Sequence, residues 1–565
     1  MEYKWKAWTV TSVGGLMASI DSTIVTLALV PIEKELNTGY VEIIWVIIGY
    51  LLVNTALVLS FGRMADILGR KNMYNLGFVI FTIGSALCAL ATSGISLILY
   101  RLVQGTGGAF LIANSMAIIT EAFPLQERGK AFGFNSIIWA VGSITGIALG
   151  GLIITYIPSI SFQWGTSTVI ISSWRWIFLI NVPIGLFGTV WAYRTLHQDK
   201  ASNNKQSYDL PAAAAFTMML VFLLIGITEG LLNQWADIWG SKGGYYGDFM
   251  AISPLFLILF LVWEIRYSKN PIIPASLFRN RVFSFSIMTV LFQSLALFSV
   301  NFLLVFYFEG VAGLTPLTAA LLIIPMSVVS AFVGPFAGRW SDRIGARIVA
   351  TLGLLIQFVM LLFLANLTLS TPLVVIAIIE AFFGLGGGLF YPANTSTVMS
   401  SSPPGKYGLT SGVLATFRNT GMILSFVVSL VAATSAIPFA LVGALFVGKL
   451  PNGRLSPAYA TTYLSGQSVA YYLSCILILV AAAFSFVRGQ LKRAPEYQRP
   501  AVPLEAASSE MGAQERDATE EADPKKLTEL VNTSSELKVS QVAGLMSMNE
   551  DETNKNAQAE EDDLE

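Results

Sequence analysis

Apolar stretches of about 20 residues alternate with short polar segments along most of the chain. A stretch of this length crosses about 30 Å of hydrocarbon as an α-helix, so the pattern predicts membrane-spanning helices. We predict fourteen spans, at residues 8–30, 43–61, 73–92, 95–120, 131–155, 174–195, 210–231, 249–266, 283–308, 317–337, 348–367, 372–398, 409–434 and 467–488. The expected fold class is an all-α polytopic membrane protein.

One polar loop occurs twice. Residues 62–71 read Gly-Arg-Met-Ala-Asp-Ile-Leu-Gly-Arg-Lys, and residues 338–347, 276 positions later, read Gly-Arg-Trp-Ser-Asp-Arg-Ile-Gly-Ala-Arg. Each copy lies between two apolar stretches. A polar loop that recurs at corresponding places in a membrane chain indicates two related halves, an architecture found in transporters.

Glycines extend the duplication into the predicted spans. At an offset of 279 residues, five pairs of glycines align: Gly105 with Gly384, Gly107 with Gly386, Gly108 with Gly387, Gly133 with Gly412, and Gly142 with Gly421. The first six spans then correspond to the last six, and the two between them are an insertion. The predicted domains are a six-helix bundle over 1–200, an inserted helix pair with linkers over 201–280, a second six-helix bundle over 281–493, and a tail over 494–565.

Charge sets the expected orientation. With both termini in the cytoplasm, 21 Lys and Arg residues fall on the inner side and 5 on the outer side, in agreement with the positive-inside rule. The tail differs from the rest: residues 494–565 carry 18 acidic and 6 basic residues, whereas residues 1–493 carry 17 and 28. Few aromatic residues and a net charge of −12 predict a disordered acidic cytoplasmic tail, whose partner the sequence leaves unknown.

The overall composition narrows the function. Charged residues make up 12% and hydrophobic residues 54%, which is too apolar for a soluble protein. Cys88 and Cys475 lie in apolar spans, and His197 stands alone in a predicted cytoplasmic loop. No cluster of His, Cys or paired acids faces one compartment, so we expect no enzyme, no metal, no cofactor and no nucleic-acid partner.

Ionisable residues inside spans are costly and therefore mark candidate functional positions. Counting along the helices places Asp21 and Arg101 at nearly the same depth, with Glu380 at a similar one. Asp21 and Arg101 either form a static ion pair, or Asp21 is a proton-titrating acid whose pKa is set by the nearby Arg101 and by burial. The offset aligns Glu380 with Arg101, so we hypothesise that Glu380 contributes to proton coupling or cation recognition. Arg418 at mid-depth either pairs across helices or faces the substrate pathway. Glu309 near the outer end is either solvated at the rim of the bundle or part of that pathway.

Two further patterns concern packing and gating. Gly142, Gly146 and Gly150, followed by Gly151, form a smooth helix face for close packing. In the repeated loops we expect inner gates, in which Asp66 accepts hydrogen bonds from an adjacent helix N-terminus and pairs with an arginine. The predicted gate residues are Gly62, Asp66, Gly69, Arg70, Asp342 and Arg343.

These motifs resemble the major facilitator superfamily, in particular its fourteen-span drug:proton antiporter branch, over about residues 5–490. The inner-loop motif matches Gly62, Ala65, Asp66, Gly69, Arg70 and Lys71. The first-span motif matches Asp21, Thr23, Ile24, Val25, Ala28 and Leu29, and the fourth-span motif matches Arg101, Gln104, Gly105 and Gly107. The run from Trp174 to Gly185 is typical of the fourteen-span branch. Ile147 stands where the span-5 antiporter motif has proline.

The resemblance implies a major facilitator fold, proton-coupling roles for Asp21 and Arg101, and a place near the pathway for Gln104. The expected function is proton-coupled export of amphipathic organic compounds or drugs across the cytoplasmic membrane, with a small-molecule substrate, protons and the lipid bilayer as partners. Alternatives are a dedicated transporter of a metabolite, peptide or siderophore, and a non-transporting membrane sensor that uses the tail to recruit a partner.

Overall fold

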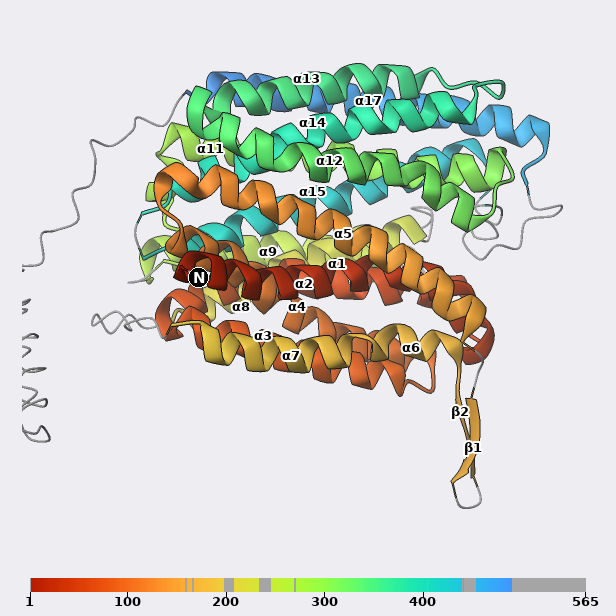
Figure 1. Cartoon of the computed structure of the whole chain (residues 1–565), viewed down its shortest axis with the longest axis horizontal. Coiled ribbons are helices and arrows are strands. Elements are labelled where there is room, and N and C mark those ends of the chain that lie inside the picture. Colours follow the sequence, from red (N-terminus) through yellow and green to blue (C-terminus); the bar gives the residue numbers. More distant parts are fainter. Residues whose placement is uncertain are drawn as a thin grey trace, which may run out of the picture. The chain divides into compact units, whose positions relative to one another are not determined.

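The computed structural model describes residues 2–157, 160–164, 167–197, 208–232, 245–268, 271–403, 405–438, 441 and 454–489. Residues 1–491 form one compact unit. The predicted acidic tail at 494–565 lies outside the described residues. Figure 1 shows long helices that share one direction, with a short β-hairpin at one end.

The first half of the chain contains seven α-helices, a short 3₁₀ turn and the hairpin. They are α1 (Tyr3–Leu36), α2 (Tyr40–Leu68), α3 (Arg70–Ala89), α4 (Gly94–Ala122), η1 (Leu125–Glu127), α5 (Arg128–Tyr156), β1 (Ile160–Trp164), β2 (Ser167–Ile171), α6 (Ser173–Leu179) and α7 (Asn181–Thr195). The hairpin is antiparallel and pairs Ile160 with Ile171.

An inserted pair and a second group of helices follow. The inserted helices are α8 (Leu210–Leu232) and α9 (Tyr245–Arg266). The second group comprises α10 (Ala275–Phe278), α11 (Arg281–Phe306), the π-turn η2 (Tyr307–Val311), α12 (Pro316–Ile344), α13 (Ala346–Ala365), α14 (Leu373–Ser400), α15 (Tyr407–Ala436) and α17 (Pro457–Val487).

Local sequence explains where several helices begin and end. Asn280 accepts backbone hydrogen bonds at the start of α11, and Thr315 does so before Pro316 at the start of α12. Short polar side chains at this position satisfy N–H groups that have no partner within the helix. At the sharp turns between α2 and α3 and between α12 and α13 stand Gly69 and Gly345, with φ of 95° and 97°. This positive φ favours glycine at both copies of the repeated loop.

The predicted all-α membrane fold is confirmed. Each of the fourteen predicted intervals lies mainly in helix, and α6 and α7 share the sixth. The third and eleventh intervals extend three and two residues beyond the ends of α3 and α13. Twelve helices of the described part are long and apolar enough to cross a membrane. The count of fourteen spans stays a prediction. The last helix begins at Pro457 rather than 467, because Ser456 caps it and proline suits the first helical position.

The duplicated glycines have equivalent neighbours in the two halves. A Cβ on Gly105 of α4 would meet the backbone of Tyr50 in α2, and one on Gly384 of α14 would meet the backbone of Met326 in α12. Because Gly105 aligns with Gly384, two helices meet at backbone distance in the same way in both halves.

The aligned glycines Gly142 and Gly421 also pack on corresponding helices of the two halves. A Cβ on Gly142 of α5 would meet Ser19 in α1, and a Cβ on Gly421 of α15 would meet Ser294 in α11. The 279-residue offset therefore describes packing as well as sequence.

The inserted pair lies beside the place where the two halves meet. Helices α8 and α9 pack on each other, and α8 also contacts α2 of the first half and α15 of the second. The indole of Trp45 in α2 donates a hydrogen bond to Glu229 of α8 at 2.8 Å. Apolar contacts among Leu52, Leu224 and Ile423 join the three helices.

We predict that Gly107→Leu in α4 strongly lowers thermal stability, because its Cβ would meet the backbone of Phe81 in α3. Overpacking of this kind costs about 1–3 kcal/mol or more. The measurement is the melting temperature of the purified protein by size-exclusion chromatography after heating. Gly151→Leu is the matched control, since a Cβ at Gly151 has no atom within 4 Å. Equal melting temperatures for the two variants would contradict this account of the packing.

Candidate functional site

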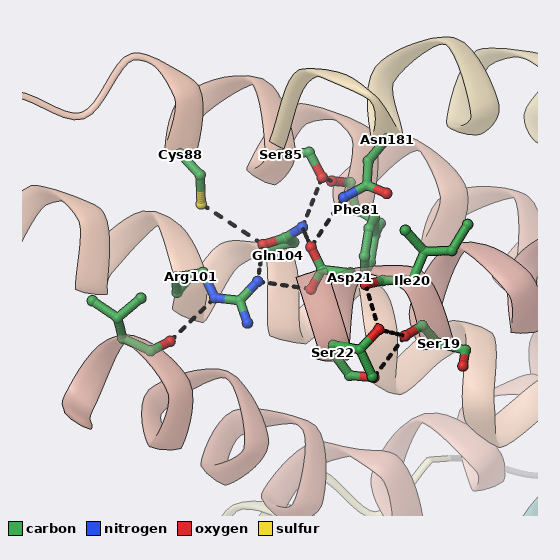
Figure 2. A network of polar contacts seen from close by, with 12 residues as sticks. Ser19, Ile20, Asp21, Ser22, Phe81, Ser85, Cys88, Arg101, Gln104 and Asn181 are labelled. Atoms are coloured by element: carbon green, nitrogen blue, oxygen red, sulfur yellow. Dashed lines mark hydrogen bonds and ion pairs between the residues drawn. The ribbon is translucent and has the colours of Figure 1, made fainter. Parts of the chain in front are cut away.

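A buried carboxylate lies at the centre of a polar network in the first half (Figure 2). Asp21 of α1 is fully buried and forms an ion pair with Arg101 of α4 at 2.7 Å. Gln104, one turn along α4, donates to Asp21 at 2.8 Å, and Asn181 of α7 donates at 3.0 Å. The Gln104 amide also donates to Ser85 of α3 at 2.8 Å. Four helices thus supply one network around a single acid.

The guanidinium of Arg101 is held on every side. It donates to the side-chain oxygen of Gln104 at 2.6 Å and to the backbone oxygen of Val46 at 3.2 Å. The ring of Tyr50 lies 4.4 Å from its central carbon, and the ring of Phe178 lies 5.8 Å away. These contacts compensate the cost of a charge inside the apolar bundle.

The expected meeting of Asp21 and Arg101 therefore occurs, and Gln104 joins them. Two further members of this network, Asn181 and Ser85, were not predicted from the sequence. A signal for Asn181 existed, because it lies in the run from Trp174 to Gly185.

The same run fixes the far end of α1. The Trp174 indole donates to Glu35 at 2.6 Å, and Arg175 pairs with Glu35 at 3.0 Å. This anchors the end of α1 to the start of α6.

A second cluster lies where the repeated loops meet the other half. The carboxylate of Asp66 accepts hydrogen bonds from the backbone N–H groups of Gly408 at 2.9 Å and Leu409 at 2.8 Å. These residues begin α15, whose unpaired N–H groups attract an anion. Asp66 also pairs with Arg70 at 2.9 Å, and Arg70 pairs in turn with Glu121.

The second copy of the loop repeats this contact in the opposite direction. The carboxylate of Asp342 accepts from the backbone N–H groups of Gly129 and Lys130, each at 3.1 Å. These residues begin α5 of the first half. Each half thus contributes one acid that caps a helix of the other half.

Glycines bring the backbones together beside both acids. A Cβ on Gly62 would collide with the backbone of Gly408, and one on Gly338 would collide with the backbone of Gly129. One turn further along, a Cβ on Gly133 would lie 2.5 Å from the carbonyl oxygen of Gly334. The two halves are therefore in backbone contact at the end predicted to be cytoplasmic, and that end is closed.

The remaining gate candidates differ in their surroundings. Gly69 forms the turn after α2, as described above. Arg343 is exposed, and no hydrogen bond or ion pair joins it to the described residues. The basic side chains beside the acids are instead Arg70 and Arg128, whose guanidiniums lie 5.6 and 5.2 Å from the ring of Tyr407.

The other charged candidates stand apart from both clusters. Glu380 of α14 is fully buried, and neither carboxylate oxygen has a hydrogen-bond partner among the described residues. Glu309 is partly buried in the π-turn after α11. Arg418 of α15 is partly exposed. No ion pair joins any of these three residues to the described part of the chain.

The glycine face of α5 packs on α1 through two of its members. A Cβ on Gly142 would lie 2.6 Å from the Ser19 Cβ, and one on Gly146 would lie 2.8 Å from the carbonyl oxygen of Ile20. Gly150 is buried, while Gly151 has open space around its Cα. The helix that bears Asp21 is therefore in close contact with the helix that Asp342 caps.

Comparison with known proteins identifies the family. The family model described as Major Facilitator Superfamily matches residues 11–426. The chain belongs to the Major Facilitator Superfamily. Members of this family are membrane transporters and not enzymes, so the expectation of a transporter is correct at this level.

Curated relatives span most of the chain. The riboflavin transporter RibZ of Clostridioides difficile is 28% identical over 487 residues, which cover 86% of this chain and 98% of RibZ. The multidrug transporter protein MdtP of Bacillus subtilis is 28% identical over 72% of this chain and 70% of its own length. The uncharacterised transporter YebQ of Escherichia coli is 30% identical over 72% of this chain and 84% of its own length.

Solved structures agree on the fold. A double-tryptophan mutant of XylE superposes with a TM-score of 0.59 at 16% identity and covers 87% of this chain and 97% of its own. A bacterial homologue of the human lysosomal transporter Spinster superposes with a TM-score of 0.52 at 16% identity. The match covers 87% of this chain and 99% of the homologue. At these identities the likeness concerns the superfamily fold alone.

We predict that Asp342→Ala shifts this transporter toward opening at its closed end, because two N–H groups of α5 lose their acceptor. Loss of such a cap costs about 0.5–2 kcal/mol, a factor of about 2 to 30 in the open-to-closed ratio. Spin labels at the exposed residues Gln126 and Arg279, one in each half, report the opening as longer distances in pulsed electron resonance.

Asp209→Ala is the matched control for the gate. Asp209 caps α8 through Ala212 at 3.2 Å within the inserted pair, so its loss removes a helix cap without touching the contact between halves. If Asp209→Ala lengthens the distances as much as Asp342→Ala does, the gate assignment is wrong.

Proposed function

We propose that this transporter exports amphipathic organic compounds across the cytoplasmic membrane in exchange for protons. The observation that supports the proposal is the network around Asp21. A single acid, fully buried in a membrane bundle, accepts hydrogen bonds from one arginine and from two side-chain amides. Protonation removes the charge that these three donors bind, so it changes the state of four helices at once.

The packing of α1 suggests how this change reaches the gate. Residues Ser19 and Ile20, next to Asp21, lie against the glycines of α5. The start of α5 is held by Asp342 of the other half. A displacement of α1 on protonation moves α5 as a rigid helix and pulls its N-terminus from the Asp342 carboxylate. Proton binding and gate opening are then coupled through one helix–helix contact.

The membrane potential supplies part of the driving force. Each elementary charge that moves down the potential releases about 2.3 kcal/mol per 100 mV. A proton that crosses the membrane from outside by way of Asp21 and leaves on the inner side releases this energy together with that of the pH gradient. The exchange can therefore move a compound against its concentration gradient.

A dedicated transporter of one metabolite is the second candidate. The relative named a riboflavin transporter is covered over 98% of its length, more than the 70% of the multidrug transporter. Transport of a panel of compounds by the purified protein in liposomes separates the two functions. A single transported compound favours the dedicated transporter, and several unrelated ones favour multidrug export.

We predict that Asp21→Asn abolishes coupling between substrate flux and an imposed pH gradient in proteoliposomes. The amide keeps the shape and part of the hydrogen bonding of Asp21 but does not titrate. Flux down a substrate gradient persists, whereas uphill flux falls by at least tenfold. Glu35→Gln is the control, since Glu35 pairs with Arg175 at the end of α1, away from the network. Uphill flux that survives in Asp21→Asn would refute the assignment.

We further predict that Glu380→Gln changes the pH dependence or the substrate range of transport. A carboxyl group without a hydrogen-bond partner in the described bundle is poorly matched to a purely structural role. The measurement is the initial rate of uphill flux between pH 5.5 and 8.5 for several substrates. If both the pH profile and the range equal those of the wild type, Glu380 takes no part in coupling or recognition.

A further inference from the structure

One cation inside the bundle has no resident counter-charge. Arg418 lies eleven residues after Tyr407 at the start of α15, or about 16 Å along the helix, which is about the middle of the hydrocarbon layer. Its side chain is partly exposed. No hydrogen bond or ion pair joins it to the described residues, and the ionisable group that interacts with it is the phenol of Tyr391, which is neutral at physiological pH.

The contacts of α15 show which way Arg418 points. Ala415 packs in a cluster with Ala109 and Ala113 of α4, in the first half. A Cβ on Gly421 would meet Leu291 and Ser294 of α11, in the second half. At 3.6 residues per turn, Arg418 is about 60° from each of these two directions. Its side chain is therefore directed between α4 and α11, where helices of both halves meet, and not toward lipid.

The groups around this position are polar and uncharged. Tyr391 of α14 and Gln293 of α11 share a hydrogen bond of 3.1 Å. The next residue on α15, Asn419, donates to Asn54 of α2 at 3.1 Å across the two halves. None of these side chains carries a negative charge, whereas in the network of the first half Arg101 is neutralised by Asp21.

An unpaired guanidinium at this depth is costly unless a ligand supplies the anion. A planar fork of N–H donors matches the two oxygens of a carboxylate, phosphate or sulfonate. Resting on the proposed transport function, we propose that the substrates are organic anions and that Arg418 binds their acidic group. Tyr391 is placed to add a neutral hydrogen bond beside it. Export of an anion is also favoured by a cytoplasm that is electrically negative.

Binding of two dyes with the same xanthene ring system and opposite charge tests the substrate class. The purified full-length protein in phosphatidylcholine nanodiscs is titrated with carboxyfluorescein, an anion, and with rhodamine 123, a cation, by fluorescence anisotropy. We expect at least tenfold tighter binding of carboxyfluorescein. Arg418→Gln lowers its affinity at least tenfold and leaves that of rhodamine 123 unchanged or higher, while Arg418→Lys gives an intermediate loss.

Two controls separate this result from other causes. Arg281→Gln removes an exposed arginine at the start of α11 and keeps wild-type affinity for both dyes. Phosphatidylglycerol added to the nanodiscs does not displace carboxyfluorescein, which excludes a lipid headgroup as the ligand of Arg418. Melting temperatures show that each variant is folded.

The outcomes separate this inference from the proposed function. Equal affinity for the two dyes, failure of the wild type to bind carboxyfluorescein, unchanged binding in Arg418→Gln, or displacement by phosphatidylglycerol overturns the inference. If Arg418-dependent binding is found but an imposed pH gradient drives no uphill flux of carboxyfluorescein, the substrate class stands and proton coupling fails. If uphill flux is found for rhodamine 123 and not for carboxyfluorescein, coupling stands and the substrate class is wrong.

Discussion

The arrangement of this transporter depends on the cost of a charge inside a lipid bilayer. Water is absent there, so each ionised side chain needs a partner from the protein or from a ligand. Asp21 and Arg101 satisfy this requirement within the first half, and amide groups of Gln104 and Asn181 complete the shell. The same requirement is not met in the second half, where Glu380 and Arg418 stand apart from each other and from other described charges. In the second half, these two charged residues thus have no ion-pair partner among the described residues.

Where the repeated loops meet the other half, backbone N–H groups rather than basic side chains bind the two acids. Asp66 and Asp342 each accept two N–H groups at the start of a helix, and glycines allow the backbones to approach. Such a contact is strong while the geometry holds and is lost over a short displacement, because hydrogen bonds weaken steeply with distance and angle. Opening at this end has to break these four hydrogen bonds and also separate the packed helices, α5 from α12 and α2 from α15. Each lost helix cap contributes about 0.5–2 kcal/mol to that cost.

The features that could be predicted from the sequence are those that repeat along the chain or depend on position along a single helix. The spans follow from apolar length, and the Asp21–Arg101 contact follows from depth counted along two antiparallel helices. The acceptor role of Asp66 follows from an acid between two glycines in a loop next to helix ends. Contacts that depend on helix rotation were not predictable in this way. Asn181 reaches Asp21 because α7 is rotated so that this side chain faces α1. The repeated loops bind the starts of α5 and α15 because each loop lies against a helix of the other half.

The duplication conserves packing and leaves the chemistry free to differ. Four of the five aligned glycine pairs meet corresponding helices in the two halves, where a larger side chain would disturb a close helix contact. At the same 279-residue offset, Glu380 stands at the position of Arg101, and Arg418 stands at the position of Trp139. A frame with two similar halves brings such positions to similar depths on either side of one axis. If the first half binds the proton and the second the substrate, the two ligands compete for no side chain. The exchange of proton and substrate is then coupled only through the movement of the two halves relative to each other.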